Sequence, residues 1–198
     1  MRKDIMVDLE TLGVSTDSTV FQISAAMFDI RTGEIIDTFD MCCDIEKMRV
    51  VAAGSTIKWW LNTNKELLTR LLMSGECSEL ELFQKFHEWI GDGDKETFLW
   101  GNGILFDNNF IRDKFTAFGM KYPIYYRNDR DVRTILELAV MKSGMSEDEF
   151  RKKLVRENPE QHNALEDVKY QVEMVHQCYK VLMGDYDVFL SSLKEASE

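Results

Sequence analysis

Hydrophobic and polar residues alternate along the chain with two different periods, and the period predicts whether a segment forms a strand or a helix. Three apolar runs of strand length come first, at residues 4–9, 19–30 and 34–44. The turn at residues 31–34 contains the pair Thr32-Gly33, which favours a hairpin. We therefore expect the second and third strands to run antiparallel.

The rest of the chain predicts helices and two further strands. Apolar residues recur at helical spacing over residues 55–74, and Ser78 with Glu81 forms a capping box that opens a second helix ending near Ile90. Beyond it we expect strand 97–100, helix 107–118, strand 122–126, helix 131–143, a charged segment at 145–161 and helix 163–183. This order predicts an α/β fold with a mixed five-stranded sheet flanked by helices.

Composition predicts one domain covering residues 1–198, because the chain has only two prolines and no segment with the composition of a linker. The apolar run at the N-terminus is short and carries acidic residues, so it predicts neither a signal peptide nor a membrane span. The four cysteines show no C-x-x-C spacing and are expected to be reduced thiols. We therefore expect a soluble, cytoplasmic protein without membrane contact.

The formal net charge of −11 argues against a general nucleic-acid coat protein, which would be basic. Global charge does not describe a local site, however. Acidic residues can bind divalent metals, and a bound metal reverses the sign of the local field.

Asp8 and Glu10 stand two residues apart at the end of the first predicted strand, so their side chains point to the same face. Two carboxylates this close repel each other unless a cation lies between them. Carboxylate oxygens suit Mg²⁺ or Mn²⁺ better than softer metals. A solvated acidic strand end is the alternative, and for an isolated Asp-x-Glu pair it is the more common one.

Asp107 lies in the segment WGNGILFDNNFI, where an apolar strand meets a Gly-rich break and a helix begins. Taken alone, it is explained most simply as a helix N-cap. His162 and Asp167 form a His-x-Ala-x-x-Asp element at the start of the last helix, where the small Ala164 leaves room. This pattern is too specific to be attributed to a helix-start residue or a solvated helix face.

The three elements together, in this order, resemble the DEDDh family of 3′→5′ exonucleases, which includes ribonuclease T, oligoribonuclease and polymerase proofreading domains. The resemblance covers residues 4 to about 183 and implies a ribonuclease H-like fold. The pair Trp59-Trp60, the element WGNG and the segment 131–134 look like the branch of ribonuclease AS and phage exonuclease A. One departure is Gly101-Asn102, where many family members carry His-Asn.

The resemblance implies a metal-dependent enzyme that hydrolyses single-stranded RNA or DNA from the 3′ end to nucleoside 5′-monophosphates. It implies two Mg²⁺ or Mn²⁺ ions that clamp the attacking and leaving oxygens. Their ligands would be Asp8, Glu10, Asp107 and Asp167. Asp8 is expected to contact both ions, and Asp107 to reach the second largely through water. His162 is expected to be the general base, because an imidazole changes charge near neutral pH.

Substrate binding is expected from residues beside these ligands and from aromatic rings that stack on bases. The candidates are Leu9, Thr11, Leu12, Trp60, Asn102 and Phe106. The resemblance places Leu9, Thr11 and Leu12 against the terminal base or its 3′-hydroxyl. Of Trp59 and Trp60, one is expected to face inward and the other outward, whereas Trp100 is expected in the core.

Basic residues occur in two clusters that either contact phosphates or form solvated charged faces. The first is Arg127, Arg130 and Arg133, and the second is Arg151, Lys152, Lys153 and Arg156. Partners implied by the resemblance are single-stranded 3′ ends and a second copy of the chain in a homodimer.

Two other interpretations stay in view. A catalytically silent nucleic-acid-binding module of the same fold would have lost a ligand or the base, yet all five residues are present. A different divalent-metal phosphohydrolase would not require the final His-x-Ala-x-x-Asp element. The choice between RNA and DNA is open, since ribonuclease AS favours RNA and the phage relatives favour DNA.

Overall fold

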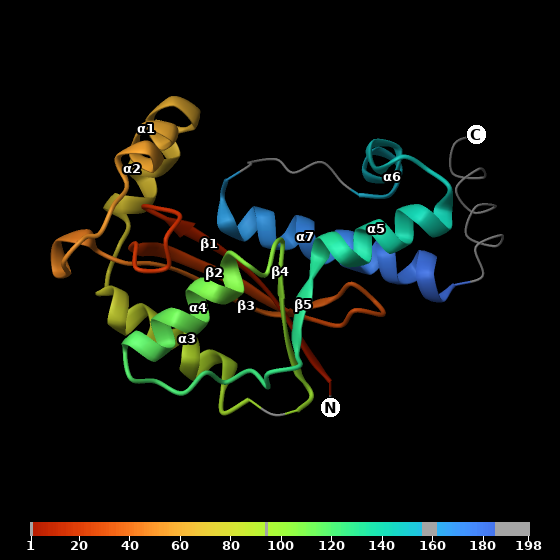
Figure 1. Cartoon of the computed structure of the whole chain (residues 1–198), viewed down its shortest axis with the longest axis horizontal. Helices are drawn as coiled ribbons and strands as arrows, with labels where there is room; N and C mark the ends of the chain where they lie inside the picture. Colours follow the sequence, from red (N-terminus) through yellow and green to blue (C-terminus); the bar gives the residue numbers. More distant parts are fainter. Residues whose placement is uncertain (1, 94, 156–161, 185–198) are drawn as a thin grey trace.

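Five strands form one mixed sheet in the order β3-β2-β1-β4-β5, with helices on both faces (Figure 1). The structure is a computed structural model that describes residues 2–93, 95–155 and 162–184. The strands are β1 (Lys3–Thr11), β2 (Val20–Phe28), β3 (Ile35–Cys42), β4 (Thr97–Gly101) and β5 (Asp129–Asp131). The predicted mixed five-stranded α/β fold is confirmed.

The centre of the sheet is β1, which pairs antiparallel with β2 on one side and parallel with β4 on the other. The hairpin between β2 and β3 is antiparallel, as the Thr32-Gly33 turn predicted, and β4 pairs parallel with β5. The β1–β2 register changes between Glu10 and Thr11, where an irregularity ends the regular pairing. Because β1 and β4 are parallel and Trp100 pairs with Met6, the carboxyl end of β4 lies beside the middle of β1, just before Asp8.

Seven α-helices cover the sheet in the described part of the chain. They are α1 (Gly54–Thr63), α2 (Lys65–Met73), α3 (Glu79–Ile90), α4 (Asp107–Ala117), α5 (Val132–Ser143), α6 (Glu147–Leu154) and α7 (Ala164–Met183). A 3₁₀ turn, η1 (Ile45–Lys47), precedes α1. Among the described residues, none of the helices combines the length and the hydropathy that crossing a membrane requires.

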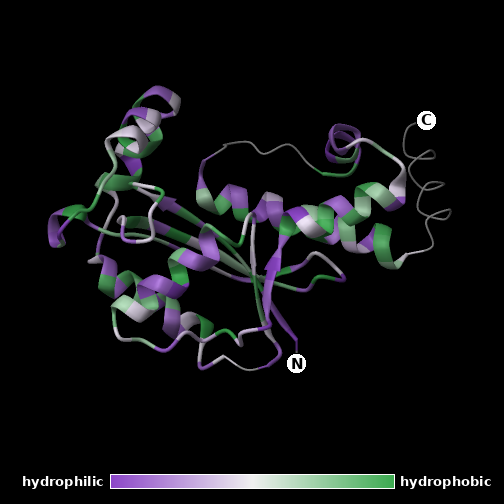
Figure 2. Ribbon diagram, in the orientation of Figure 1, coloured by the Kyte–Doolittle hydropathy of each residue, from purple (hydrophilic) through white to green (hydrophobic). Residues whose placement is uncertain are grey.

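Each face of the sheet has its own hydrophobic core. On one face the buried side chains of α3 and α4, including Phe83, Phe86 and Phe115, pack beneath β1 and β2. On the other face α5, α6 and α7 pack around Trp100 and Phe150. In Figure 2 hydrophilic and hydrophobic residues lie on different sides of the helices, and the visible side of α6 is almost wholly hydrophilic.

The predicted helix at 55–74 is two helices, because Asn64 leaves helical backbone angles with φ −156° and ψ 75°. The Asn64 side chain then accepts a hydrogen bond from the backbone N–H of Leu67 and caps α2. Asn competes for backbone hydrogen bonds in this way, so it favours a cap over a helix interior. The apolar period of the sequence continues across the break and conceals it.

The predicted strand at 122–126 is wrong, and β5 forms later, at Asp129–Asp131. Pro123 cannot donate a backbone hydrogen bond to a sheet. Instead, the side chain of Asn128 donates to the carbonyl oxygens of Lys95 and Thr97 and fixes the loop beside β4. The edge strand therefore begins immediately after Asn128.

The charged segment at 145–161 contains α6, which the sequence analysis left unassigned. Ser146 and Glu149 form a complete capping box at its start. That capping box is visible in the sequence as a Ser-x-x-Glu pattern, and it is the signal that would have revealed the helix. Arg156 and Pro159 lie outside the described residues.

Candidate active site

Asp8 and Glu10 lie near the carboxyl end of β1 and share one face of the strand, as period-two geometry predicted. Asp167, from α7, approaches them across that face. One carboxylate oxygen from each of the three residues lies within 4.8 Å of the others. The structure thus brings together two parts of the sequence that are more than 150 residues apart.

Hydrogen bonds near His162 fix the backbone at the start of α7. Asn163 caps the helix by accepting from the backbone N–H of Glu166, and Ala164 is fully buried. His162 has a positive φ of 66°, a conformation that non-glycine residues seldom adopt but that His tolerates better than most. Its backbone N–H donates to Oδ2 of Asp167 at 3.0 Å, which holds the turn next to the carboxylates.

Asp107 begins α4 after the loop 102–106 that follows β4, and the residue is 5% exposed. The close approach of α4 to β4 requires a glycine at position 101. A Cβ there would lie 2.6 Å from Oδ1 of Asn108 and 3.4 Å from Cβ of Asp107. The Gly101-Asn102 departure noted in the sequence is therefore accommodated by the packing of this helix start.

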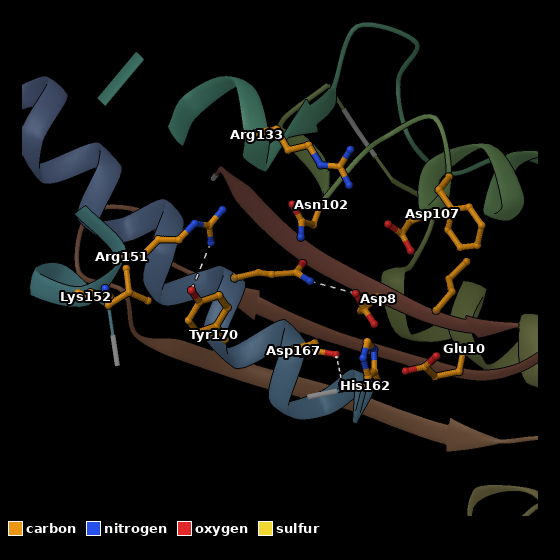
Figure 3. A pocket seen from close by; sticks show the side chains of 14 residues that line it. Asp8, Glu10, Asn102, Asp107, Arg133, Arg151, Lys152, His162, Asp167 and Tyr170 are labelled. Carbon is orange, nitrogen blue, oxygen red and sulfur yellow. Dashed lines mark hydrogen bonds between the residues drawn. The ribbon is translucent and has the colours of Figure 1, made fainter. Parts of the chain in front are cut away.

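All five predicted residues line one open cleft with a volume of about 1080 Å³. Figure 3 shows Asp8, Asp107, Glu10 and Asp167 gathered toward one end, with His162 between Asp167 and Glu10. Asp107 faces the same cleft, but it is not part of the group of three within 4.8 Å. Its expected role through water stays a prediction.

The environment of the cleft disfavours the ionised forms of Asp8, Glu10 and Asp107. Burial raises the pKa of Asp8 well above its usual range, and the charges of Asp107 and Asp167 add to this rise. Burial also raises the pKa of Glu10, with Asp8 the largest charge contribution. For Asp107, burial raises the pKa to about 7, against the opposing effect of the backbone N–H of Leu9.

A bound cation would remove this penalty, because an adjacent positive charge favours the ionised form of a carboxyl group. The donor atoms are all carboxylate oxygens, which are the ligands of hard divalent cations. The residues present therefore fit a divalent metal centre.

A second groove of about 520 Å³ adjoins the cleft on the side of α1. It is lined by Leu9, Glu10, Thr11, Val14, Ser55, Thr56, Trp59, Trp60 and Phe106. Leu9, Glu10 and Phe106 also line the cleft, so the two hollows are neighbours.

The tryptophan pair divides as the sequence predicted, with one ring inward and one outward. Trp60 is 1% exposed and its indole N–H donates to the carbonyl oxygen of Thr11. Trp59 is 45% exposed and lies edge-on to the His162 ring, with 5.0 Å between ring centroids. Trp59 therefore offers the larger free surface to a base, and the predicted substrate contact of Trp60 stays a prediction, whereas Trp100 is in the core as expected.

The other predicted substrate residues are distributed unevenly. Asn102 lines the cleft, Leu9 and Phe106 line both hollows, and Thr11 lines the groove while its hydroxyl donates to the carbonyl oxygen of Gly13. Leu12 lines neither hollow and is 2% exposed within the core, and its predicted contact with substrate stays a prediction.

Gln171 and Tyr170, which the sequence patterns did not indicate, also line the cleft. Gln171 donates from Nε2 to Oδ1 of Asp8 at 2.9 Å. It follows Asp167 by four residues on α7, so both lie on one face of the helix. This i, i+4 spacing is the signal from which its position could have been inferred.

A sequence-family model described as the Rv2179c-like 3′-5′ exoribonuclease domain matches residues 3–179. No curated protein sequence matches the chain. Among solved structures, E. coli exonuclease I in complex with a dT13 oligonucleotide has a TM-score of 0.67 at 17% identity, covering 94% of this chain and 43% of that one. A zinc-bound form of E. coli exonuclease I with single-stranded DNA has a TM-score of 0.64 at 15% identity, covering 96% and 43%.

The Mg²⁺- and Mn²⁺-bound form of S. pombe Pop2p has a TM-score of 0.65 at 13% identity, covering 89% of this chain and 82% of that one. The chain spans less than half of the length of the exonuclease I structures that it matches. At these identities the likeness establishes the fold, and it confirms the predicted ribonuclease H-like architecture.

Proposed function

Because the chain belongs to the family of Rv2179c-like 3′-5′ exoribonuclease domains and is a 3′-5′ exonuclease, we propose that it hydrolyses single-stranded RNA to nucleoside 5′-monophosphates with a divalent metal cofactor. The observation that carries the proposal is the group of three carboxylates within 4.8 Å, placed beside His162 in an open cleft. The catalytically silent alternative has no support, since all five expected residues line that cleft.

The residues that would hold the metal are Asp8, Glu10 and Asp167, with Asp107 nearby in the same cleft. When bound, Mg²⁺ or Mn²⁺ supplies positive charge that offsets the charge developing on the phosphodiester and promotes ionisation of water. Solved structures of the same fold are described with bound zinc and with bound Mg²⁺ and Mn²⁺. A pair of ions matches the four acidic side chains in total charge.

His162 is the proposed general base. Its imidazole accepts a proton from the water that attacks the last phosphodiester, the bond from phosphorus to the preceding O3′ breaks, and the terminal nucleotide leaves with its 5′-phosphate. The backbone bond to Asp167 and the ring contact with Trp59 keep this side chain near the carboxylates.

The terminal base would occupy the groove beside α1, where Trp59 offers an exposed ring and which Leu9 and Phe106 also line. An aromatic face stacks on any base, so this contact provides affinity without sequence preference. The predicted contacts of Thr11 and Asn102 with the substrate remain part of the proposal.

RNA is proposed because the family description names an exoribonuclease. The oligonucleotides in the exonuclease I structures are DNA, but those proteins share only the fold. A homodimer, also implied by the resemblance, stays a prediction that the molar mass from light scattering would test.

The test is digestion of matched 5′-labelled RNA and DNA oligonucleotides in Mg²⁺ or Mn²⁺. We expect stepwise shortening from the 3′ end, faster on RNA, abolished by chelation and by Asp8→Ala. Activity that survives Asp8→Ala would overturn the assigned site, and faster digestion of DNA would overturn the substrate.

A further inference from the structure

The cleft extends well beyond the carboxylates, and its far part is basic. In Figure 3 Arg151 and Lys152 lie at the end away from Glu10 and Asp107, past Tyr170, and Arg133 lies along the upper edge. All three basic residues line the same cleft as the carboxylates. One cleft therefore has an acidic end and a basic end, in a chain with a net charge of −11.

These residues come from two basic clusters that are separate in sequence. Arg133 begins α5 just beyond β5, whereas Arg151 and Lys152 lie in the last turn of α6. The other two members of the first cluster are placed differently. The guanidinium of Arg130 lies 4.6 Å from the ring centroid of Phe98, and that of Arg127 lies 5.2 Å from Tyr126. Among the residues that the structure describes, the fold thus places one member of the first cluster and two of the second along the cleft.

Arg151 is held in place before any substrate arrives. Its Nε and Nη2 contact Oε1 of Glu147 at 2.8 and 2.7 Å, and its Nη1 donates to the hydroxyl of Tyr170 at 3.2 Å. Tyr170 is adjacent in sequence to Gln171, which contacts Asp8. The guanidinium is therefore tied to the same helix that carries Asp167, so its distance from the carboxylates is set by α7.

Arg133 lies across the loop that follows β4. Gly103 has a φ of 118°, and a Cβ at that position would lie 3.2 Å from the guanidinium carbon. The absence of a side chain at Gly103 lets the charged group lie against the backbone at the rim of the cleft.

We propose that Arg133, Arg151 and Lys152 bind successive backbone phosphates of a single RNA strand, upstream of the bond that is cut. The inference rests on the proposed function and adds the direction in which the RNA strand lies in the cleft. The strand enters over α6 and passes Tyr170. Its 3′ nucleotide lies between the carboxylates and Trp59. Arg side chains recognise phosphate with planar, paired donors, and an acidic protein needs such a local field to attract a polyanion.

The test compares two substrates that differ in length. The p-nitrophenyl ester of thymidine 5′-monophosphate has one phosphate and reports the chemistry at the carboxylates, and a ten-nucleotide RNA reports the chemistry together with the upstream contacts. In the double variant Arg151→Gln/Lys152→Gln, we expect the ratio of kcat/KM for the RNA to kcat/KM for the ester to fall about tenfold or more. Lys153→Gln is the matched control, because it removes an exposed charge from the same turn of α6 outside the cleft, and we expect it to leave the ratio unchanged.

Binding as a function of salt gives a second readout. For single strands, each phosphate contact contributes about 0.7 to the slope of log affinity against log salt concentration. In an Asp8→Asn background, the double variant should lower this slope by about 1.4, and Lys153→Gln should not lower it. An unchanged ratio and an unchanged slope would overturn the proposal. If the parent chain hydrolysed neither substrate, the proposed function itself would fail, which is a different result.

Discussion

Gln171 donates a hydrogen bond of 2.9 Å from its carboxamide nitrogen to Oδ1 of Asp8, and so connects α7 to β1 at the centre of the cleft. Gln171 is 5% exposed, and its own carbonyl oxygen has no hydrogen-bond partner among the described residues. The bond lowers the pKa of Asp8 against the larger effect of burial. One helix therefore supplies both a carboxylate, Asp167, and the donor that orients the carboxylate opposite it.

We predict that Gln171→Leu weakens Mn²⁺ binding and catalysis by about tenfold or more, the range known for residues that orient metal ligands. Leucine keeps the volume of the side chain but removes the donor, so the Asp8 carboxylate can rotate. Calorimetric titration with Mn²⁺ measures the affinity. Gln177→Leu makes the same chemical change further along α7 and should have no effect. Unaltered Mn²⁺ affinity in Gln171→Leu would show that Asp8 is positioned without this bond.

His162→Asn should lower kcat by about 10²-fold or more, the usual contribution of a general base. Asparagine is the suitable replacement because it tolerates the positive φ of this position, so the turn and its backbone bond to Asp167 are kept. Mn²⁺ titration should give an affinity close to that of the parent. Complete loss of Mn²⁺ binding would instead assign His162 to the metal site and remove it from the role of base.

Trp59 touches the His162 ring edge-on and also presents an exposed surface to the groove. Trp59→Leu should raise KM about tenfold, which matches the lower part of the range of about 1–3 kcal/mol for one stacked base. Trp59→Phe should restore most of the affinity because it keeps an aromatic face. In NMR spectra, the His162 ring protons should shift in Trp59→Leu as the indole ring current disappears. A Phe variant as impaired as the Leu variant would contradict stacking.

The residues of the site could be predicted from sequence because each has a local signature. Asp8 and Glu10 are two residues apart, the spacing that places side chains on one face of a strand. His162 and Asp167 match a pattern expected at the start of a helix. Their meeting within one cleft depends on the central position of β1 and the packing of α7 over it, which no local pattern contains. The resemblance to a known family provided that step.

Other features depend on tertiary structure that the local signals do not report. The position of β5 follows from hydrogen bonds of Asn128 to a loop more than 30 residues away. The selection of Arg133, Arg151 and Lys152 from two clusters depends on how α5 and α6 pack beside α7. Trp59 and Trp60 alternate in exposure as neighbours on a helix do, but which ring faces the core is decided by the contact of Trp60 with Thr11.

The buried carboxyl group of Asp107 makes the stability of the metal-free protein depend on pH. Burial raises its pKa from the ordinary 3.8 to about 7, so the folded state favours the protonated form. A raised carboxyl pKa means that this favourable effect is fully present at low pH and is lost as the pH rises toward and through 7. In a chelator, the protein should therefore become less stable between about pH 4 and pH 8.

Asp107→Asn removes the titrating group while keeping an oxygen that can accept from the backbone N–H of Leu9. We predict that in EDTA at pH 8 this variant melts several degrees above the parent, and that the difference shrinks as the pH falls and nearly disappears below about pH 4, where Asp107 is mostly protonated in both the folded and the unfolded state. Addition of Mn²⁺ at pH 8 should raise the melting temperature of the parent more than that of the variant, because the cation favours the ionised carboxylate.

Asp113→Asn removes an exposed carboxylate from the same helix and should show no such pH dependence. If the parent and Asp107→Asn were equally stable at pH 8 without metal, the prediction would be wrong. Other groups of the protein would then already compensate the charge of the ionised Asp107 side chain.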